Sequence, residues 1–457
     1  MPPPRQPVRR FALLTSLLVL ATVPATAGAA SVNVVRGAGF GHGIGMSQYG
    51  AYGFAQQGFG HERILRHYYR GAELGSAPNR PVRVLLQASD PYVRFTGARR
   101  VAGRRLNPRR TYVVRPGGGG RLRVEGIGIL RGPVRVTGQG PMRLLGPALN
   151  GITSGLYRDD FVLRPGALGG VTAINLIGID PYVQGVVPGE MPSSWDYDAL
   201  RAQSVTARTY ALATRKTGEV FDLYPDTRSQ VYTGVRGETA RTNTAVRDTR
   251  RQVLKYAGEP IVTYYFSTSG GRTENVELSF LGSTPQPYLK SVRDPYDGIS
   301  PRHRWRFRFS DATMGAKLGA PGSFRRVDVT RRGRSPRIVS ARVVGSRGSR
   351  ALSGASIRAR LELYDSWAHF SRVSTSRVGE SRRRPRAARS AFPAIAGSFT
   401  PAPRSSRVTV ERREDGRWER VRDVHTSTRG RYRTTVGLPG AYRVRSGSVA
   451  GPTVRLR

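Results

Sequence analysis

One carboxylate stands out because apolar residues surround it and two prolines flank it. The stretch GVVPGEMPSSW, residues 185–195, contains Glu190 as its single acid. The neighbours Val187 and Met191 should exclude water from this carboxylate, and partial desolvation raises a carboxyl pKa toward the range of a general acid. Pro188-Gly189 predicts a tight turn just before it. The alternative is that Glu190 only pairs with the N-terminus of the helix that follows.

Two further stretches carry side chains that can bind a polar ligand. In GHGIGMSQYG, residues 41–50, His42 can act as a base or donor, although a His among glycines is also typical of simple packing. In YYFSTSGG, residues 264–271, Tyr264 can stack on a ligand, and Ser267 and Ser269 can form hydrogen bonds with it. Gly270-Gly271 would let the backbone approach that ligand, and a plain glycine turn is the alternative.

A helix is the clearest element that the sequence predicts beside Glu190. Residues 194–216, SWDYDALRAQSVTARTYALATRK, repeat apolar or small residues with a period of mainly 3.6. Asp196 or Asp198 can cap its start, and a basic pair suits its end. Gln203 and Arg208 fall on this helix five residues apart, so they do not share one face closely. The stretch VTAINLIGID before Glu190 is typical of a buried strand.

Composition divides the rest of the chain into an α+β arrangement. Residues 1–30 combine basic residues, an apolar run and A-x-A sites, as a signal peptide does, so we expect a secreted, extracellular protein. Residues 80–175 alternate short β-like runs with Gly, Pro and Asn, which predicts a β-rich subdomain. Residues 376–397 are typical of a basic linker, and residues 398–457 predict a small C-terminal all-β, sandwich-like domain.

The charge of the chain is strongly positive. Its 75 Lys and Arg residues against 30 Asp and Glu give a formal net charge of +45, almost all from arginine. This bias indicates either a solvated surface in a protein from a GC-rich genome or attraction to an anionic partner. For an exported protein that partner would be an anionic wall polymer or lipid, and nucleic acid is not expected. The absence of cysteine excludes disulfides and thiolate metal sites.

Four motifs together resemble the SpoIID/LytB family of stage II sporulation protein D-like proteins. They are YVQGVVPGEMPSSWDYDALRAQSVTARTYALA, YYFSTSGGRTENVE, PYLKSVRDPYD and GHGIGMSQYGAYGFAQQGFGHERILRHYYRGAEL. The resemblance implies a SpoIID-like mixed core formed by residues 31–79 and 176–375. It also implies a cell-wall-associated lytic transglycosylase that cleaves peptidoglycan glycan strands to 1,6-anhydromuramyl ends, with no cofactor. Some members are described instead as amidase enhancers, so a non-catalytic, wall-binding enhancer of an N-acetylmuramoyl-L-alanine amidase is the alternative.

The resemblance also implies roles for individual residues. Glu190 becomes the catalytic acid, because the family's catalytic glutamate lies in its version of GVVPGEMP. Gln203 and Arg208 match the pattern AQ…ART and would orient Glu190 or hold sugar groups, with a structural role as the alternative. The substrate-binding candidates are Gln203, Arg208, Tyr264, Ser267, Ser269, His42, Ser47 and Gln48. Some members bind zinc, but Arg228 and Ser229 stand where a His and a Cys would be expected, so we expect no metal site.

The order of the motifs departs from the family. In many members the GHGxGMSQYGA segment comes last, whereas here it comes directly after the predicted signal peptide. A circular permutation explains this order and is tolerated when termini lie close together at the surface. It predicts that residues 37–75 pack against residues 180–300. Without that packing, His42 and Gln48 could not belong to the site.

Overall fold

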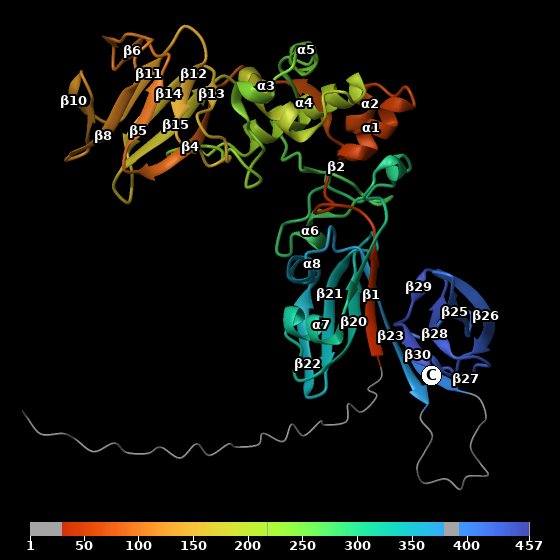
Figure 1. Cartoon of the computed structure of the whole chain (residues 1–457). Helices are drawn as coiled ribbons and strands as arrows, with labels where there is room; N and C mark the ends of the chain where they lie inside the picture. Colours follow the sequence, from red (N-terminus) through yellow and green to blue (C-terminus); the bar gives the residue numbers. More distant parts are fainter. Residues whose placement is uncertain (1–29, 217, 379–392, 457) are drawn as a thin grey trace, which may run out of the picture. The chain divides into compact units, whose positions relative to one another are not determined.

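The computed structural model describes residues 30–216, 218–378 and 393–456 (Figure 1). The predicted signal peptide lies outside these residues except for Ala30. One compact unit spans Asn33–Phe370, and the described residues from Ser371 onward form a second unit with those up to Val32. In the described part of the chain, no helix has the length and apolar character needed to cross a membrane.

Two six-stranded antiparallel sheets make up the β-rich part of the first unit. One contains, in spatial order, β10 (Gly128–Arg131), β9 (Arg121–Val124), β8 (Tyr112–Gly118), β5 (Val93–Thr96), β12 (Met142–Leu145) and β13 (Leu156–Tyr157). The other contains β4 (Val82–Asp90), β15 (Val171–Ile177), β14 (Asp160–Pro165), β11 (Val134–Thr137), β6 (Arg100–Val101) and β7 (Arg104–Arg105). Leu122 and Val124 are buried while Arg121 and Arg123 are exposed, which is the two-residue period of a half-buried strand. The buried faces of both sheets belong to one apolar core.

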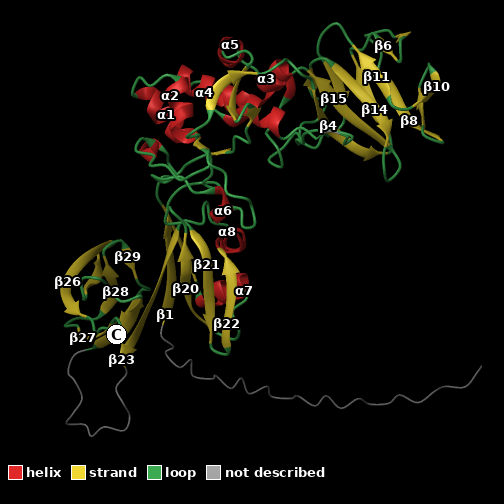
Figure 2. Ribbon diagram, turned by 180° about the vertical axis from the view of Figure 1, so that it is seen from behind, coloured by secondary structure: helices red, strands yellow, loops and turns green. Residues whose placement is uncertain are grey.

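Five helices form a group in the next part of the first unit (Figure 2). They are α1 (Gln48–Gln56), α2 (His61–Tyr68), α3 (Ile179–Glu190), α4 (Tyr197–Ala213) and α5 (Ala240–Asp248). Helix α4 is central, because it contacts the other four. Its N-cap is Asp196, whose side chain accepts a hydrogen bond from the backbone of Asp198. The helix predicted from the sequence is therefore confirmed, with Asp196 as its cap.

The prediction of a tight turn at Pro188-Gly189 is wrong, because both residues belong to helix α3. The chain leaves strand β15 and enters α3 at Ile179, and the helix continues to Glu190 with Pro188 inside its last turn. Proline is tolerated in a first turn, where Pro181 lies, and near the end it removes only one helical hydrogen bond. Tyr182 and Val186 are fully buried on this helix. Burial of its apolar face therefore outweighs the weak helix propensity of two prolines and two glycines.

Short strands join the N-terminal segment to the rest of the helical region. Strand β2 (Met46–Ser47) pairs in parallel with β18 (Tyr265–Phe266). Strand β3 (Glu73–Ser76) pairs with β16 (Gln252–Tyr256), which also pairs with β17 (Glu259–Pro260). Helices α1 and α2 both contact α4. The predicted packing of residues 37–75 against residues 180–300 is confirmed.

A third part of the same unit combines a sheet with two helices. Strands β20 (Phe324–Arg332), β21 (Ile338–Gly345) and β22 (Gly348–Ser353) form this sheet, and α7 (Asp311–Leu318) and α8 (Gly354–Leu361) pack on it. Met314, Val343 and Ile357 are fully buried in its core. Strand β1 (Ala30–Gly37) pairs with β19 (Trp305–Phe309). The remaining short elements are α6 (Val276–Ser279) and the 3₁₀ helices η1 (Gly234–Gly237) and η2 (Asp297–Ile299).

Among the described residues of the C-terminal unit, all regular secondary structure is β-strand. Strand β24 (Ala394–Thr400) pairs with β23 (Ala368–Val378) and with β27 (Arg431–Thr435). A second group contains β26 (Arg417–His425), β25 (Arg407–Glu414), β28 (Gly440–Ser446), β29 (Val449–Ala450) and β30 (Val454–Leu456). With the mixed first unit, this confirms the predicted α+β fold class with its C-terminal all-β part.

The linker predicted for residues 376–397 has narrower limits in the structure. Strand β23 continues to Val378 and β24 begins at Ala394, and these two residues are paired. Both ends of the predicted linker are therefore strand, because pairing with a neighbouring strand overrides the basic, Ala-rich composition. The residues between them, 379–392, lie outside the described part of the chain.

Candidate functional site

Glu190 is the last residue of α3 and is partly buried. Its Oε1 accepts a hydrogen bond of 2.8 Å from the backbone N–H of Val231. Its carboxylate also accepts hydrogen bonds from the side chains of Tyr265 and Gln48. The Gln48 amide in addition donates to the backbone carbonyl of Glu190, at 3.0 Å. Residues from three distant segments therefore hold one carboxylate in place.

The surroundings of Glu190 favour its protonated form. Burial raises the pKa of this carboxyl, whereas the hydrogen bonds from Val231, Tyr265 and Gln48 lower it, and the net shift is upward. The negative end of the α3 dipole also disfavours a charge at this position. A raised pKa of this kind suits a carboxyl that first donates a proton and then accepts one as the carboxylate.

A chain of polar side chains fixes the orientation of Tyr265. The Tyr182 hydroxyl donates to Gln230 Oε1 at 3.1 Å, and Gln230 Nε2 donates to the Tyr265 hydroxyl oxygen at 3.1 Å. Because the Tyr265 oxygen accepts from Gln230, its own proton is free to be donated to Glu190. The segment that contains Gln230 and Val231 lies close to α3, since a Cβ at Gly189 would lie 2.9 Å from the Val231 carbonyl.

Sequence reasoning missed Tyr265, Gln230 and Val231. In YYFSTSGG it selected Tyr264, but neighbouring residues of a strand point to opposite sides, and Tyr265 is the one that faces Glu190. The Tyr264 ring instead contacts the rings of His42 and Phe280, at centroid distances of 5.9 and 5.2 Å. Tyr264 is partly buried, so its role in stacking on a ligand stays a prediction.

His42 supports the backbone of Tyr265. Its Nδ1 accepts from the Ile44 N–H at 3.1 Å, so its Nε2 carries the proton that contacts the Tyr265 carbonyl at 3.0 Å. Burial, with Arg358 and Arg337 as lesser contributors, lowers the pKa of His42 to about 3. With both nitrogens engaged, the structure favours the packing interpretation of His42 over a catalytic base. The glycines around it are needed, since a Cβ at Gly45 would lie 1.9 Å from the Tyr264 carbonyl.

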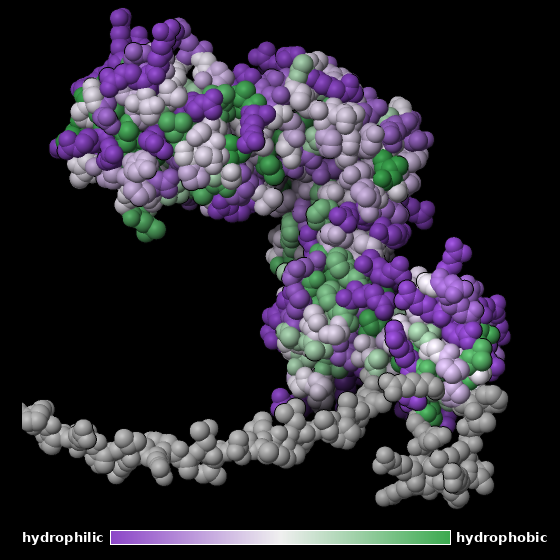
Figure 3. Space-filling model, in the orientation of Figure 1, coloured by the Kyte–Doolittle hydropathy of each residue, from purple (hydrophilic) through white to green (hydrophobic). Residues whose placement is uncertain are grey.

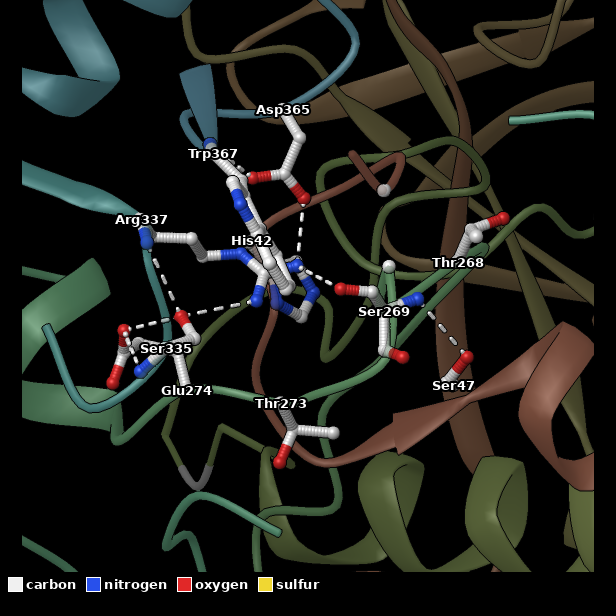
Figure 4. A network of polar contacts seen from close by, with 12 residues as sticks. His42, Ser47, Thr268, Ser269, Thr273, Glu274, Ser335, Arg337, Asp365 and Trp367 are labelled. Atoms are coloured by element: carbon white, nitrogen blue, oxygen red, sulfur yellow. Dashed lines mark hydrogen bonds and ion pairs between the residues drawn. The ribbon is translucent and has the colours of Figure 1, made fainter. Parts of the chain in front are cut away.

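Ser47 and Ser269 are buried and bonded to the protein itself. Ser47 Oγ accepts from the backbone N–H of Gly50 and of Ser269, at 3.1 and 3.2 Å, and it caps α1 (Figure 4). Ser269 Oγ donates to Asp297 at 2.9 Å. These contacts indicate that both serines build the loop rather than bind a ligand. Ser267 is only partly buried, and its carbonyl accepts from the Tyr49 N–H at 3.0 Å, so it lies close to α1.

Two buried carboxylates, Asp294 and Asp297, lie under this loop. Asp297 accepts from Ser269 and from the Gly270 N–H, and Asp294 accepts from the Tyr68 hydroxyl at 2.8 Å. Burial, followed by the neighbouring charge of Asp297, raises the pKa of Asp294 to about 7. Asp294 is therefore protonated in the folded protein over a pH range in which the unfolded chain is ionised.

We expect Asp294→Asn to remove a pH-dependent part of the stability. The unfolded chain loses this proton near pH 3.8 but the folded protein keeps it to about pH 7, so the parent's free energy of unfolding falls as pH rises between these values. The shift corresponds to roughly 4 kcal/mol. Urea denaturation at about pH 5 and about pH 8 measures this change, and the free energy of unfolding should fall less between the two pH values for the variant than for the parent. Asp328→Asn, at a carboxylate whose side chain is 43% exposed, is the control. If the free energy of unfolding of the Asp294 variant falls with pH as much as that of the parent, this role of Asp294 is contradicted.

The contacts of Arg208 favour the structural role that was the alternative to substrate binding. It is fully buried, and its Nε donates to Asp180 at 2.8 Å near the start of α3. Its other nitrogens donate to the carbonyls of Val246 and Gln252, at 3.1 and 3.3 Å. Arg208 therefore joins α3, α4, α5 and β16, at the opposite end of α3 from Glu190.

Gln203 has no contact with Glu190 among the described interactions, whereas an aromatic group lies on α1 beside Gln48. Gln203 is fully buried, and neither of its amide atoms has a hydrogen-bond partner among the described residues. On α1, Tyr49 and Tyr52 contact Trp195, and the Tyr52 and Trp195 rings stack at 4.6 Å and 8°. This aromatic group directly follows Gln48 along α1, so it adjoins the residues that hold Glu190.

Arg228 and Ser229, which stand where the resemblance implies zinc ligands in some members, have other contacts here. Arg228 forms an ion pair with Asp226 at 2.6 Å, and Ser229 Oγ accepts from the Tyr224 N–H at 3.1 Å. Across residues 30–216, 218–378 and 393–456, no group of three or more His, Cys, Asp or Glu side chains is placed to hold a metal ion.

Comparison with known proteins identifies the central part of the chain. Residues 167–256 match the SpoIID family model, described as stage II sporulation protein. This segment is therefore similar to the SpoIID family. The match runs from just before β15 to the end of β16, and so includes Glu190, Gln203, Arg208 and Gln230. Gln48, His42 and Tyr265 lie outside the matched residues. Only the fold brings Gln48 and Tyr265 into contact with Glu190.

Curated relatives extend this comparison. Stage II sporulation protein D of Bacillus subtilis (strain 168) is 33% identical over 164 residues, which are 32% of this chain and 47% of the relative. An amidase enhancer of the same organism is 40% identical over 136 residues, 30% of this chain and 18% of the relative. An uncharacterised protein of Brachyspira hyodysenteriae is 37% identical over 122 residues, 26% of this chain and 33% of the relative. The chain thus spans less than half the length of each of these relatives.

Proposed function

We propose that the protein is an exported cell-wall enzyme that cleaves peptidoglycan glycan strands by lytic transglycosylation, with Glu190 as its catalytic residue. The observation that carries this proposal is the partly buried Glu190 carboxyl, whose pKa is raised and whose orientation is held by Val231, Tyr265 and Gln48. The SpoIID match supports a cell-wall role. The substrate would be peptidoglycan, and anionic wall polymers would be additional partners of this basic protein.

A single carboxyl is sufficient for this chemistry. Protonated Glu190 would donate its proton to the oxygen that joins N-acetylmuramic acid to N-acetylglucosamine, and the bond from that oxygen to C1 would break. The carboxylate would then take the proton from the muramyl C6 hydroxyl as that oxygen bonds to C1 and closes the 1,6-anhydro ring. The proton given to the leaving group is thereby recovered, and no water is consumed. A glycosidase that hydrolyses its substrate generally uses a second carboxylate as nucleophile or base, whereas this reaction needs only Glu190.

The first experiment is product analysis by mass spectrometry. The purified chain without residues 1–29 is incubated with intact peptidoglycan and with peptidoglycan stripped of its peptides. Glycan fragments that end in 1,6-anhydromuramic acid are expected from at least one of them. Products that carry one added water would contradict transglycosylation, and the absence of any cleavage would contradict an enzyme.

An enhancer of a wall amidase is the second candidate, because a 40% identical relative is named an amidase enhancer. In that case the chain would bind the wall and increase the rate at which a separate amidase releases peptides. Addition of the chain to an N-acetylmuramoyl-L-alanine amidase acting on the same peptidoglycan tests this. Stimulation that survives Glu190→Gln, without 1,6-anhydro products from the parent, would favour the enhancer.

We expect Tyr265→Phe to shift the pH dependence of cleavage upward. The Tyr265 hydroxyl lowers the pKa of Glu190 by hydrogen bonding to its carboxylate, so loss of the hydroxyl raises that pKa further. A reaction that needs protonated Glu190 should then stay active to higher pH, while its maximal rate falls because the carboxyl is held less firmly. The measurement is the rate of product release across pH, with the exposed Tyr256→Phe as control. An unshifted profile would contradict the role of Tyr265.

A further inference from the structure

A cavity beside His42 has no role in the proposed reaction. Its volume is about 80 Å³, and its walls come from the His42 loop, the residues from α6 to Leu281, and the starts of β21 and α8. One wall is apolar and includes Leu278, Phe280 and Val339. Hydrophobic atoms, in green, reach the surface where α6 and α8 lie (Figure 3), and Leu281 is 56% exposed. The cavity can therefore hold a small apolar group.

The other wall of the cavity is cationic. Arg337 is 2% exposed, forms an ion pair with Asp365 at 2.8 Å and donates to the Arg272 carbonyl at 2.8 Å. Figure 4 shows its guanidinium between Asp365 and Ser335, next to His42. The Nε of Arg337 is buried and has no hydrogen-bond partner among the described residues. A buried N–H of this kind calls for an acceptor.

Arg358 is the second cation, and its charge is not neutralised by a contact. Its side chain makes no hydrogen bond or ion pair with residues of the described part of the chain, although Asp365 attracts it more weakly. Burial is the main cause that lowers the pKa of Arg358. An arginine that stays charged while partly removed from water is costly without a partner.

The charges around the cavity match one monoanion. Asp365 neutralises Arg337 through their ion pair, and His42 is uncharged because its pKa is about 3. Among the residues that line the cavity, this leaves the single positive charge of Arg358. A guanidinium presents two parallel N–H donors, which fit the two oxygens of a carboxylate. The apolar wall and the small volume limit the rest of the ligand to a short carbon group.

We propose that this cavity binds a carboxylate carried on a short apolar group, with Arg358 as its main ligand and Arg337 Nε as a second donor. The lactyl carboxylate of muramic acid, which is free only where the stem peptide has been removed, and the alanyl carboxylate that ends a stem peptide both have this chemistry, and their identification rests on the function proposed above. The cavity is connected to Glu190, since His42 supports the backbone of Tyr265 and the Tyr265 side chain contacts Glu190. A carboxylate bound there would help set the position of the glycan.

Titration with small acids tests this proposal. The chain without residues 1–29 is titrated by calorimetry with N-acetylmuramic acid, with N-acetyl-D-alanyl-D-alanine and with the methyl ester of each. We expect one acid to bind and its ester not to bind, and the acid that binds identifies the source. Histidine-labelled protein should show a shift of the His42 ring signal, assigned among the six histidines by His42→Gln. Inorganic phosphate is the control for unspecific anion binding.

Variants on α8 assign the binding to Arg358. Arg358→Gln should weaken binding at least tenfold, and Arg358→Lys, which keeps the charge but loses the planar pair of donors, should weaken it less. Arg360→Gln, an exposed position on the same helix, should change affinity by less than twofold. The proposal fails if neither acid binds, if ester or phosphate binds as tightly as acid, or if both Arg358 variants bind like the parent. Binding through Arg358 without any release of 1,6-anhydro ends would overturn the proposed function and leave the cavity's ligand class standing.

Discussion

Replacing Glu190 by Gln should reduce the release of 1,6-anhydromuramyl ends by about 10²- to 10⁴-fold. The amide keeps the size of the side chain and can still accept a hydrogen bond from the Val231 N–H, but it cannot give up and recover a proton. Product release by the parent and the variant is compared by mass spectrometry on the same peptidoglycan. The exposed Glu219→Gln is the matched control and should keep the parental rate.

The same variant separates catalysis from damage to the fold. Burial raises the pKa of Glu190 in the folded protein, so its charged form is disfavoured there. The carboxyl therefore lowers stability once pH exceeds its unfolded pKa of 4.5, and Gln removes this loss. We expect Glu190→Gln to unfold at higher urea concentration than the parent near neutral pH and at the same concentration near pH 4. Loss of activity together with lower stability would mean that the residue is structural.

Replacing Arg208 by Met should lower the free energy of unfolding by about 3 kcal/mol or more, because it leaves Asp180 partly buried without its main partner. Three carbonyl groups on α4, α5 and β16 also lose the donors that Arg208 supplies. Arg250, which lies 3.6 Å from Asp180, is exposed and offsets only part of the loss. Urea denaturation followed by circular dichroism measures the change.

Two further variants make this result interpretable. Arg201→Gln on the same helix removes an ion pair with Asp198 that is partly exposed to solvent, so it should cost less than about 1 kcal/mol. The double variant Arg208→Met with Asp180→Asn should be more stable than Arg208→Met alone, because it removes the unpartnered charge. A small effect of Arg208→Met on stability, together with a large effect on cleavage, would instead return Arg208 to the substrate-binding group.

The sequence pointed to Glu190 through its local surroundings. Val187 and Met191 are buried as their apolar character predicts, and the pKa of the carboxyl between them is raised. The period of residues 194–216 and the capping aspartate predicted α4 closely, because a long amphipathic helix with a polar cap is a local pattern. The α+β fold class followed from similarly local signals.

The tertiary structure decided which side chains meet Glu190. Gln48 lies 142 residues away from it in the sequence, and the Tyr265 side chain faces it while the neighbouring Tyr264 ring lies with His42. Whether Tyr264 or Tyr265 faces Glu190 depends on how β18 pairs with β2. Each of these strands has only two residues, so their sequences are too short to predict the register of the pairing. Pairing between distant segments is not a local property of the chain.

Burial decided the remaining roles. Ser47, Ser269 and Arg208 have side chains suited to a polar ligand, yet each is buried and bonded to the protein itself. Helix α3 formed through Pro188 because its apolar face is covered by other segments, which no local propensity reports. The sequence by itself indicated Glu190 as the candidate acid, the helix beside it and the class of fold. Only the packing of distant segments determined which polar groups hold that acid and which ones hold the fold, because hydrogen-bond partners are chosen by the burial that packing creates.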